Sequence, residues 1–564
     1  MENQNTPQPE DLSKQNRVPD SANTPGENTL SEQTASQSVT PTAASMITPG
    51  VPKAMPPNYK PYVPRSQTPE YQAFKSRVVS VKGLVVTIFS ILLAILFTET
   101  IFLGSAGISV PIFAVAYYTT LFYFFHENNK PISKPALFLT VPVFLLAFSF
   151  FLHYNPSTQF ITWLTLIALV CIQLVMLGTN PAEGLFSFDM FIKVMVNVIG
   201  RSFSNLGMPF VSFEVLKGKR TKASRNTMLI LIGLAVSLPV AVILMGLFMS
   251  ADAVFEKAVN NVIDFAGLDL GNIFADVFLG FWGGIFLSAA LLGLKYEEEK
   301  QKSAGKVGNN IDRLVIGTFL TIINICLIAF VGFQFAYLFG GTANITLTDM
   351  TYAEYARRGF FELTAASAII FTIALLVLIM TKKIEDQLPV WVKLCTVSLC
   401  LCNGVLLVSA VKRMLLYVDA YGLSVKRVLT LWLMCLIALC LVWMIIKCFA
   451  PKIDVMRLIG VTVVAAVCIL SLTNTEKLIA RYNIDRYISD PTKITIDIYH
   501  LGSLSYTTSP EIARLKEVSG GQFTRVEIID ILNSQKAAFE SRNALYGFTL
   551  DSLKAGEVFS GLTK

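Results

Sequence analysis

The sequence predicts an all-α polytopic membrane protein with about eleven transmembrane helices and a small soluble C-terminal domain. Hydrophobic residues make up 53% of the 564 residues and charged residues only 15%, well below the quarter that is usual in soluble domains. The apolar residues are gathered into continuous runs of about 20 residues, the length that crosses the hydrocarbon layer as a helix. These segments must be helical, because an open strand would leave backbone polar groups unpaired in lipid.

The chain divides by composition into three parts. Residues 1–74 are rich in Pro, Ser, Thr, Gln and Asn, which predicts a disordered cytoplasmic tail. This tail lacks the charged start and apolar run of a signal peptide, so we expect it to be retained. A transmembrane domain follows over 75–473, and its predicted spans are 83–103, 107–125, 136–152, 157–178, 227–249, 272–294, 314–339, 360–381, 389–411, 428–450 and 455–473.

The basic residues predict the orientation. Lys and Arg are roughly three times as frequent in one set of alternate connections as in the other, and the richer set normally faces the cytoplasm. The run Lys217–Arg225 belongs to the richer set. The N-terminus is therefore expected inside and, with an odd number of spans, the C-terminus outside.

A helix with one polar stripe is expected over 185–203. Asp189, Lys193, Asn197 and Arg201 recur every four residues between apolar positions, as in a helix that lies at an interface. The alternative is a further span, which would carry the basic run that follows to the outside.

The last part, 474–564, returns to a soluble composition and predicts a small extracytoplasmic domain. Residues 494–499 alternate like a short strand, whereas 509–518 and 526–545 follow helical periodicity.

Several site classes find no support. The nine cysteines lie inside predicted spans and form no CxxC pair, so they are expected to be packing residues. His126, His153 and His500 fall in different loops or domains, so we expect neither a metal nor a cofactor. The net charge of +7 is attributed to an anionic lipid surface and not to nucleic acid. Without a Walker A, HExxH or GxSxG motif, no enzyme class is indicated.

Three clusters rich in Arg and Tyr follow or precede spans at the predicted outer side. They are 355–362, 413–422 and 481–487. Basic residues are usually sparse there, and arginine offers paired donors to an anion. The candidate residues for an anion or lipid site are Tyr355, Arg358, Glu362, Arg413, Tyr417, Arg481 and Arg486. Anchoring of helix ends by Tyr and Arg is the alternative interpretation.

The connection between two spans predicts that these residues share a depth. Spans 360–381 and 389–411 are joined by a short segment, so they should be antiparallel neighbours. The second helix is expected to continue to Tyr421, with Gly422 as its stop and Ser424 as the N-cap of the next helix. Glu362 would then lie just inside the apolar layer, where a carboxylate needs a partner.

The same segments resemble a family of bacterial multi-pass proteins catalogued as domain of unknown function 4173. Residues 351–363 are similar to its first motif and 413–423 to its second, while 483–487 and 501–505 resemble the segment that follows its last span. The resemblance covers roughly 225–515 and implies a bacterial integral membrane protein of unestablished function. We expect such a protein in the bacterial cytoplasmic (inner) membrane. It assigns no catalytic residue.

The function predicted from these patterns is binding of an anionic lipid or an envelope precursor at the outer ends of the eighth to eleventh spans. Membrane lipids are the expected partners, with an envelope protein at the C-terminal domain as a further expectation. A secondary transporter with a polar midplane cavity and a membrane-embedded transferase are the alternatives. Polar residues inside the spans, which a transporter would use, are Glu99, Gln173, Asp276, Asn324, Gln334 and Asn403.

Overall fold

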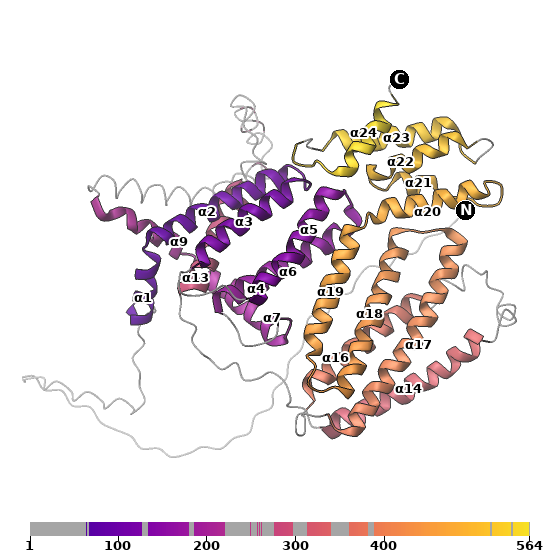
Figure 1. Cartoon of the computed structure of the whole chain (residues 1–564), viewed down its shortest axis with the longest axis horizontal. Coiled ribbons are helices and arrows are strands. Elements are labelled where there is room, and N and C mark those ends of the chain that lie inside the picture. Colours follow the sequence, from indigo (N-terminus) through magenta and orange to yellow (C-terminus); the bar gives the residue numbers. More distant parts are fainter. Residues whose placement is uncertain are drawn as a thin grey trace, which may run out of the picture. The chain divides into compact units, whose positions relative to one another are not determined.

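The computed structural model is helical, and the part of the chain that it describes contains no β-strand (Figure 1). It describes residues 67–126, 134–179, 185–219, 276–296, 313–339, 360–381, 388–518, 522–542 and 545–562, with the single positions 64, 249, 257, 259 and 261. The helices of the first half are α1 (Pro69–Val78), α2 (Val81–Phe97), η2 (Thr98–Leu103), α3 (Ser109–Phe125), α4 (Lys134–Phe138), α5 (Thr140–Leu152), α6 (Pro156–Thr179), α7 (Phe188–Val194), η3 (Met195–Gly200), α8 (Arg201–Ser204), α9 (Met208–Ser212), η4 (Phe213–Lys219), η5 (Asp276–Trp282) and α13 (Gly283–Tyr296). Those of the second half are α14 (Arg313–Phe339), α16 (Phe360–Met380), α17 (Val390–Tyr421), α18 (Val425–Phe449), α19 (Val455–Leu472), α20 (Thr475–Ser489), α21 (Ile498–Gly502), η7 (Tyr506–Thr508), α22 (Ser509–Ala513), η8 (Arg514–Glu517), α23 (Arg525–Glu540) and α24 (Leu550–Ser560).

Nine helical stretches within these ranges are long and apolar enough to cross a membrane. A further apolar helix, α3, has 17 residues and is shorter than that criterion requires. Together they match all the predicted spans except 227–249, which lies outside the described residues apart from position 249. The chain is therefore a multi-pass membrane protein, while the count of eleven spans stays a prediction.

Two hydrophobic cores divide the membrane helices. The first core joins α1–α7 and α13, which we call the N-terminal group; the second joins α14, α16, α17 and α18, the C-terminal group. Helix α19 belongs to both, because Val455 and Ile459 are buried in the second core and Val467 and Cys468 in the first. α19 accordingly packs against α18 on one side and against α5 and α6 on the other.

Small residues allow α2 and α13 to approach closely. A Cβ atom added at Gly284 would fall 2.4 Å from Cα of Ile91, so only glycine fits there. Hydroxyl groups reinforce the contact, since Thr87 lies 2.9 Å from Ser288 and accepts a 3.1 Å bond from Ser212. This use of glycine and hydroxyl side chains is typical of helix packing in lipid.

The segment predicted as an interfacial helix is helical and runs without a gap through α7, η3 and α8, with η3 as a π-helical middle part. Its predicted polar stripe does not face outward: Asn197 is 3% exposed and donates to the carbonyl of Lys193. Phe191 and Phe203 are exposed instead, at 58% and 64%. The stripe packs toward the protein because α8 and η3 contact α13. Whether the segment lies at the interface stays a prediction.

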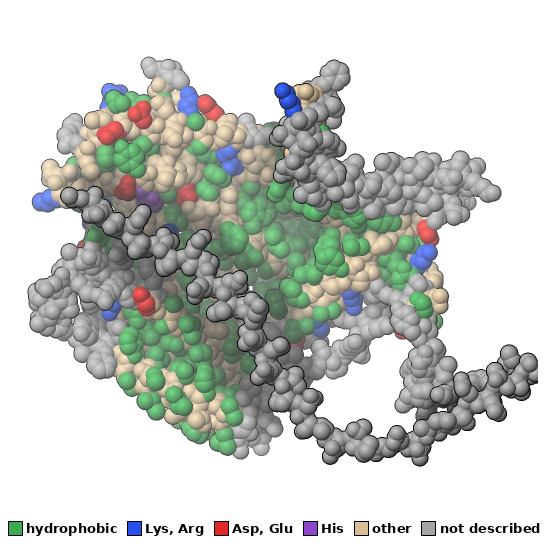
Figure 2. Space-filling model, turned by 180° about the vertical axis from the view of Figure 1, so that it is seen from behind, with side chains coloured by type: hydrophobic (Ala, Val, Ile, Leu, Met, Phe, Trp, Pro, Cys, Tyr) green, Lys and Arg blue, Asp and Glu red, His purple; other side chains and the backbone are tan. Residues whose placement is uncertain are grey.

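Helices α20–α24, the terminal helices, follow α19 (Figure 1). Their core includes Leu423 from the turn between α17 and α18 and Val425 and Val428 from the start of α18, and residues 63–564 form one compact unit. A separate C-terminal domain is therefore not confirmed. On the face seen in Figure 2, charged side chains gather on this part, whereas hydrophobic side chains cover much of the long helices.

One element and one segment boundary differ from the prediction. The strand expected over 494–499 is wrong, because Asp497 caps α21 by accepting from the amide of His500 and thereby starts a helix at Ile498. The boundary at 74 falls inside α1, whose Phe74 is 3% exposed. Both differences arise where a local cap outweighs composition or alternation.

Candidate functional site

A cavity of about 430 Å³ opens between α14, α16 and α17. Its wall is apolar except for two charged side chains, Glu362 in the first turn of α16 and Arg413 on α17. The apolar lining consists of Ile323, Cys326, Leu327, Phe330, Leu363, Ala366 and Leu406. Cys326 and Phe330 are exposed on the outer surface of α14, so the cavity lies at the side of the bundle that meets lipid.

Buried amides hold the three helices of the cavity together. Asn403 of α17 donates a 3.0 Å bond to the carbonyl of Ser367 in α16. Asn324 of α14 donates a 3.0 Å bond to the carbonyl of Cys395 in α17. In the N-terminal group, Gln173 similarly donates to the carbonyl of Ala136. These intramembrane polar residues therefore link helices, as amides commonly do in lipid.

Glu362 and Arg413 share the cavity but do not form an ion pair. No contact of 4.0 Å or less joins their charged atoms in the described structure, and Glu362 is exposed. Their common cavity brings the two residues near each other, while their shared depth in a membrane stays a prediction. The direct hydrogen bond expected between Glu362 and an arginine or tyrosine of the clusters is not present among the described residues.

Tyr417 lies one turn beyond Arg413 and joins a different set of contacts. The guanidinium of Arg427 lies 4.2 Å from the centre of the Tyr417 ring, within the range of a cation–π contact. Arg427 also donates to the carbonyls of Tyr421 (3.1 Å) and Gly422 (2.6 Å). The arginine thus satisfies carbonyls that the end of α17 leaves without helical donors.

The turn between α17 and α18 is held from outside by α20. Gly422 has φ +74°, and a Cβ added there would fall 2.3 Å from Oδ1 of Asn483. Asn483 accepts from the amide of Leu423 (2.7 Å) and donates to its carbonyl (2.8 Å). Arg486 donates to the carbonyls of Val418 and Asp419.

The remaining candidates fall elsewhere. Arg481 is exposed on α20 and lies 3.7 Å from Asp485 of the same helix, so it does not reach the cavity. Tyr355 and Arg358 lie outside the described residues. The seven candidates therefore divide into a cavity pair, two residues at the α17–α18 turn and one exposed residue, with two not described.

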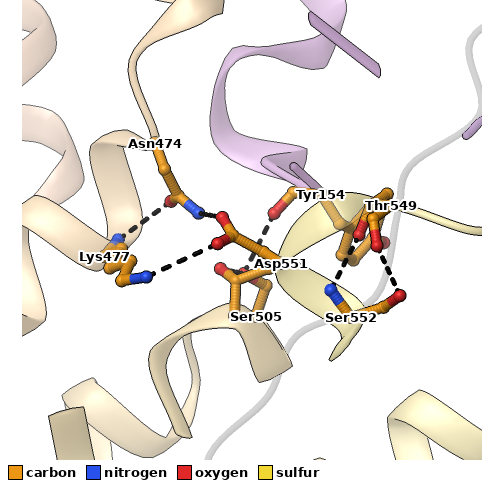
Figure 3. A network of polar contacts seen from close by, with 8 residues as sticks. Tyr154, Asn474, Lys477, Ser505, Thr549, Asp551 and Ser552 are labelled. Atoms are coloured by element: carbon orange, nitrogen blue, oxygen red, sulfur yellow. Dashed lines mark hydrogen bonds and ion pairs between the residues drawn. The ribbon is translucent and has the colours of Figure 1, made fainter. Parts of the chain in front are cut away.

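A polar interface that the sequence did not reveal joins the terminal helices to the N-terminal group. Glu476 is 2% exposed, and its carboxylate accepts from the amides of Ser157 (3.3 Å) and Ser505 (2.7 Å) and from the Ser157 hydroxyl. Around it, Asn474 donates 2.8 Å to Asp551, and Ser505 donates 3.2 Å to the carbonyl of Tyr154 (Figure 3). In the sequence, only helix-capping residues such as Asn474 could have pointed to this interface.

The comparisons with known proteins place the chain without assigning an activity. A family model described as a domain of unknown function (DUF4153) matches residues 140–515. The family number 4173 suggested by the motifs is not matched, although the two descriptions agree in assigning no function. No curated protein and no solved structure matches the chain.

Proposed function

Since this chain belongs to the DUF4153 family, whose description assigns no activity, its own residues must indicate what it does, and we propose that it binds a phosphate-bearing lipid in the α14–α16–α17 cavity. The observation that carries the proposal is the composition of the cavity wall. It is apolar along its length and has one guanidinium and one carboxylate. That division matches an amphiphile with an acyl chain and a charged headgroup.

The two charges specify the headgroup. Arg413 carries a guanidinium group, whose planar geometry matches phosphate as well as carboxylate. Glu362 stands in the same wall and disfavours a headgroup that is only negative. A zwitterionic headgroup could place its phosphate beside Arg413 and its ammonium group beside Glu362, so both charges of the wall would face an opposite charge.

The lining favours this function over transport. A transporter site is expected to have convergent polar side chains and interrupted helices at mid-membrane. Asn324 and Asn403 instead donate to carbonyls of neighbouring helices, and the helices that line the cavity are continuous over their described lengths. A lipid site that contributes to scaffolding or sensing fits these contacts better.

Native mass spectrometry of the full-length protein in detergent tests the proposal. We expect the wild-type protein to retain one phospholipid, and Ala366→Phe to lose it because the ring fills the cavity. Arg413→Gln should weaken retention at least about tenfold, since a charge-assisted hydrogen bond is lost. Glu362→Gln should shift the preference from phosphatidylethanolamine toward phosphatidylglycerol.

Lys412→Gln is the matched control, because it removes the same charge from the neighbouring position of α17 without altering the cavity wall. Its lipid retention should equal that of the wild type. The proposal is wrong if the wild-type protein retains no lipid, or if Ala366→Phe and Arg413→Gln retain it as Lys412→Gln does.

A further inference from the structure

A second cavity lies at the α17–α18 turn, apart from the residues of the lipid cavity. Its volume is about 280 Å³, and it is enclosed by the turn, by α20 and by residues that lead into α21. The lining residues are Tyr421, Gly422, Leu423, Ser424, Arg427, Asn483, Arg486, Ile494, Thr495, Ile496, Asp497, His500 and Leu501. None of them lines the cavity of Glu362 and Arg413.

The charges of this cavity favour an anion. Arg427 and Arg486 contribute two guanidinium groups, and Asp497 contributes one carboxylate. The Asp497 carboxylate is engaged in capping α21, where it accepts 2.9 Å from the amide of His500. Both arginines are fixed by main-chain carbonyls through their terminal nitrogens, so the guanidinium groups are held in place before a ligand arrives. Such preorganisation lowers the entropy cost of binding.

Two nitrogen atoms of the lining need a partner. Nε of Arg427 and Nε2 of His500 are buried and make no hydrogen bond to any group in the described structure. A buried polar atom without a partner costs free energy, so such groups are nearly always paired in folded proteins. Nε of Arg427 can only donate, and Nε2 of His500 donates in the tautomer that carries its proton there. An oxyanion supplies several acceptors at once.

The start of α18 adds further donors. Ser424 is the N-cap residue, yet its hydroxyl makes no capping hydrogen bond. The amides of the first turn of a helix have no intrahelical acceptor, and α18 is 25 residues long, so its N-terminus carries partial positive charge. Ser424 and Arg427 both line the cavity, so the N-terminus of α18 lies at its wall together with the guanidinium groups of Arg427 and Arg486.

We propose that this cavity binds the phosphate of a small phosphomonoester, with Arg427, Arg486 and His500 as its ligands. Guanidinium groups pair with phosphate in bidentate geometry, and helix N-termini bind phosphate through amides. The volume is near the lower end for ligand pockets, which favours a small ester. The phosphomonoester is either a soluble metabolite or a lipid headgroup, because the cavity lies where the apolar helices end.

Calorimetric titration of the full-length protein in detergent with glycerol 3-phosphate tests the proposal, with inorganic phosphate as a second probe and chloride at equal ionic strength as the reference. We expect saturable binding of the phosphates. His500→Gln and Arg427→Lys should each raise the Kd about tenfold or more. Lys426→Gln is the matched control, because this exposed lysine lies beside Arg427 but does not line the cavity, and it should change the Kd less than about twofold.

A second arm distinguishes the sources. Protein in nanodiscs with and without phosphatidic acid is titrated with glycerol 3-phosphate. Competition by phosphatidic acid identifies a lipid headgroup, and its absence identifies a soluble ester; both outcomes support a phosphate site. The proposal is overturned if neither phosphate binds saturably and the two nanodiscs give the same titration curve. It is also overturned if His500→Gln and Lys426→Gln change the Kd equally.

Discussion

A single buried carboxylate, Glu476, ties the terminal helices to the start of α6. Pro156 and Ser157 are the first residues of α6, so the carboxylate binds the amide end of that helix, where negative charge is favoured. The same group accepts from the amide of Ser505. One side chain thus satisfies donors from two segments that are far apart in the sequence.

Replacement of Glu476 should be costly. Glu476→Ala leaves the amides of Ser157 and Ser505 without their acceptor inside a buried interface, and we expect a loss of about 2–4 kcal/mol of stability. Thermal unfolding of the purified protein in detergent measures it. Glu517→Ala, which removes an exposed carboxylate from η8, is the control and should change the midpoint little. Equal effects of the two replacements would contradict the assigned role.

His153 makes the same interface sensitive to acid. Its Nε2 atom lies 2.8 Å from the carbonyl oxygen of Ser471. Burial lowers the pKa of His153 below its usual 6.5, and this outweighs the opposing effect of the hydrogen bond to Ser471; nearby Asp551 raises the pKa and Lys477 lowers it. The folded protein therefore keeps His153 neutral at a pH where the unfolded chain protonates it.

The sign of the pH dependence follows from this lowered pKa. Between the folded value and 6.5 the unfolded state binds more protons, so stability is fully present above pH 6.5 and falls as the pH drops through that window. We expect the unfolding midpoint of His153→Gln to decline less between about pH 7 and about pH 5.5 than that of the wild type. This pH interval lies on the order of one unit around the usual histidine pKa. Parallel declines would exclude His153 as the cause.

At the scale of elements, the end of α17 depends on the backbone of one residue. Gly422 combines a φ of +74° with close approach to Asn483, so Gly422→Ala is opposed by both backbone strain and a steric clash. We expect a loss of about 2 kcal/mol or more. Gly404→Ala, in the middle of the same helix, meets nothing within 4 Å and should be neutral or stabilising by up to about 1 kcal/mol. Thermal unfolding of both variants provides the comparison.

The sequence predicted the elements that depend on local rules. The extent of α17 to Tyr421, its stop at Gly422 and the N-cap position of Ser424 are all confirmed, because each rests on periodicity or backbone freedom. The strand over 494–499 was wrong because Asp497 starts a helix. Helix α20 was missed because the composition changes at 473–474, where two capped helices meet.

The candidate site shows the limit of such reasoning. A shared depth for Glu362 and Arg413 followed from the hairpin between α16 and α17, and both residues line one cavity. The contribution of α14 to that cavity could not be predicted, because α14 packs against α17 through tertiary contacts. Likewise, Arg427 was not among the residues predicted for the site, because its role depends on the carbonyls of Tyr421 and Gly422, which the fold brings to it.

For the whole molecule, the excess of basic residues predicts that the terminal helices face outside. Tyr499 is 72% exposed on α21, and Lys452 is exposed in the connection between α18 and α19. In intact cells, an impermeant maleimide should label Tyr499→Cys above the background of the parent protein and should not label Lys452→Cys until the membrane is opened. The reverse pattern would invert the orientation.

The interface between the terminal helices and the first loops has a consequence for biosynthesis. Arg542 donates 2.9 Å to the carbonyl of Ala106, and the amide of Ile108 donates 2.9 Å to the carbonyl of Phe548. The residues joined by the first bond are 436 positions apart, so at ordinary translation rates the ribosome needs roughly 20–90 s to supply the second partner. Throughout that interval the newly inserted α2 and α3 present an unpaired loop, and insertion factors that shield it should associate with the nascent chain until its last helices emerge.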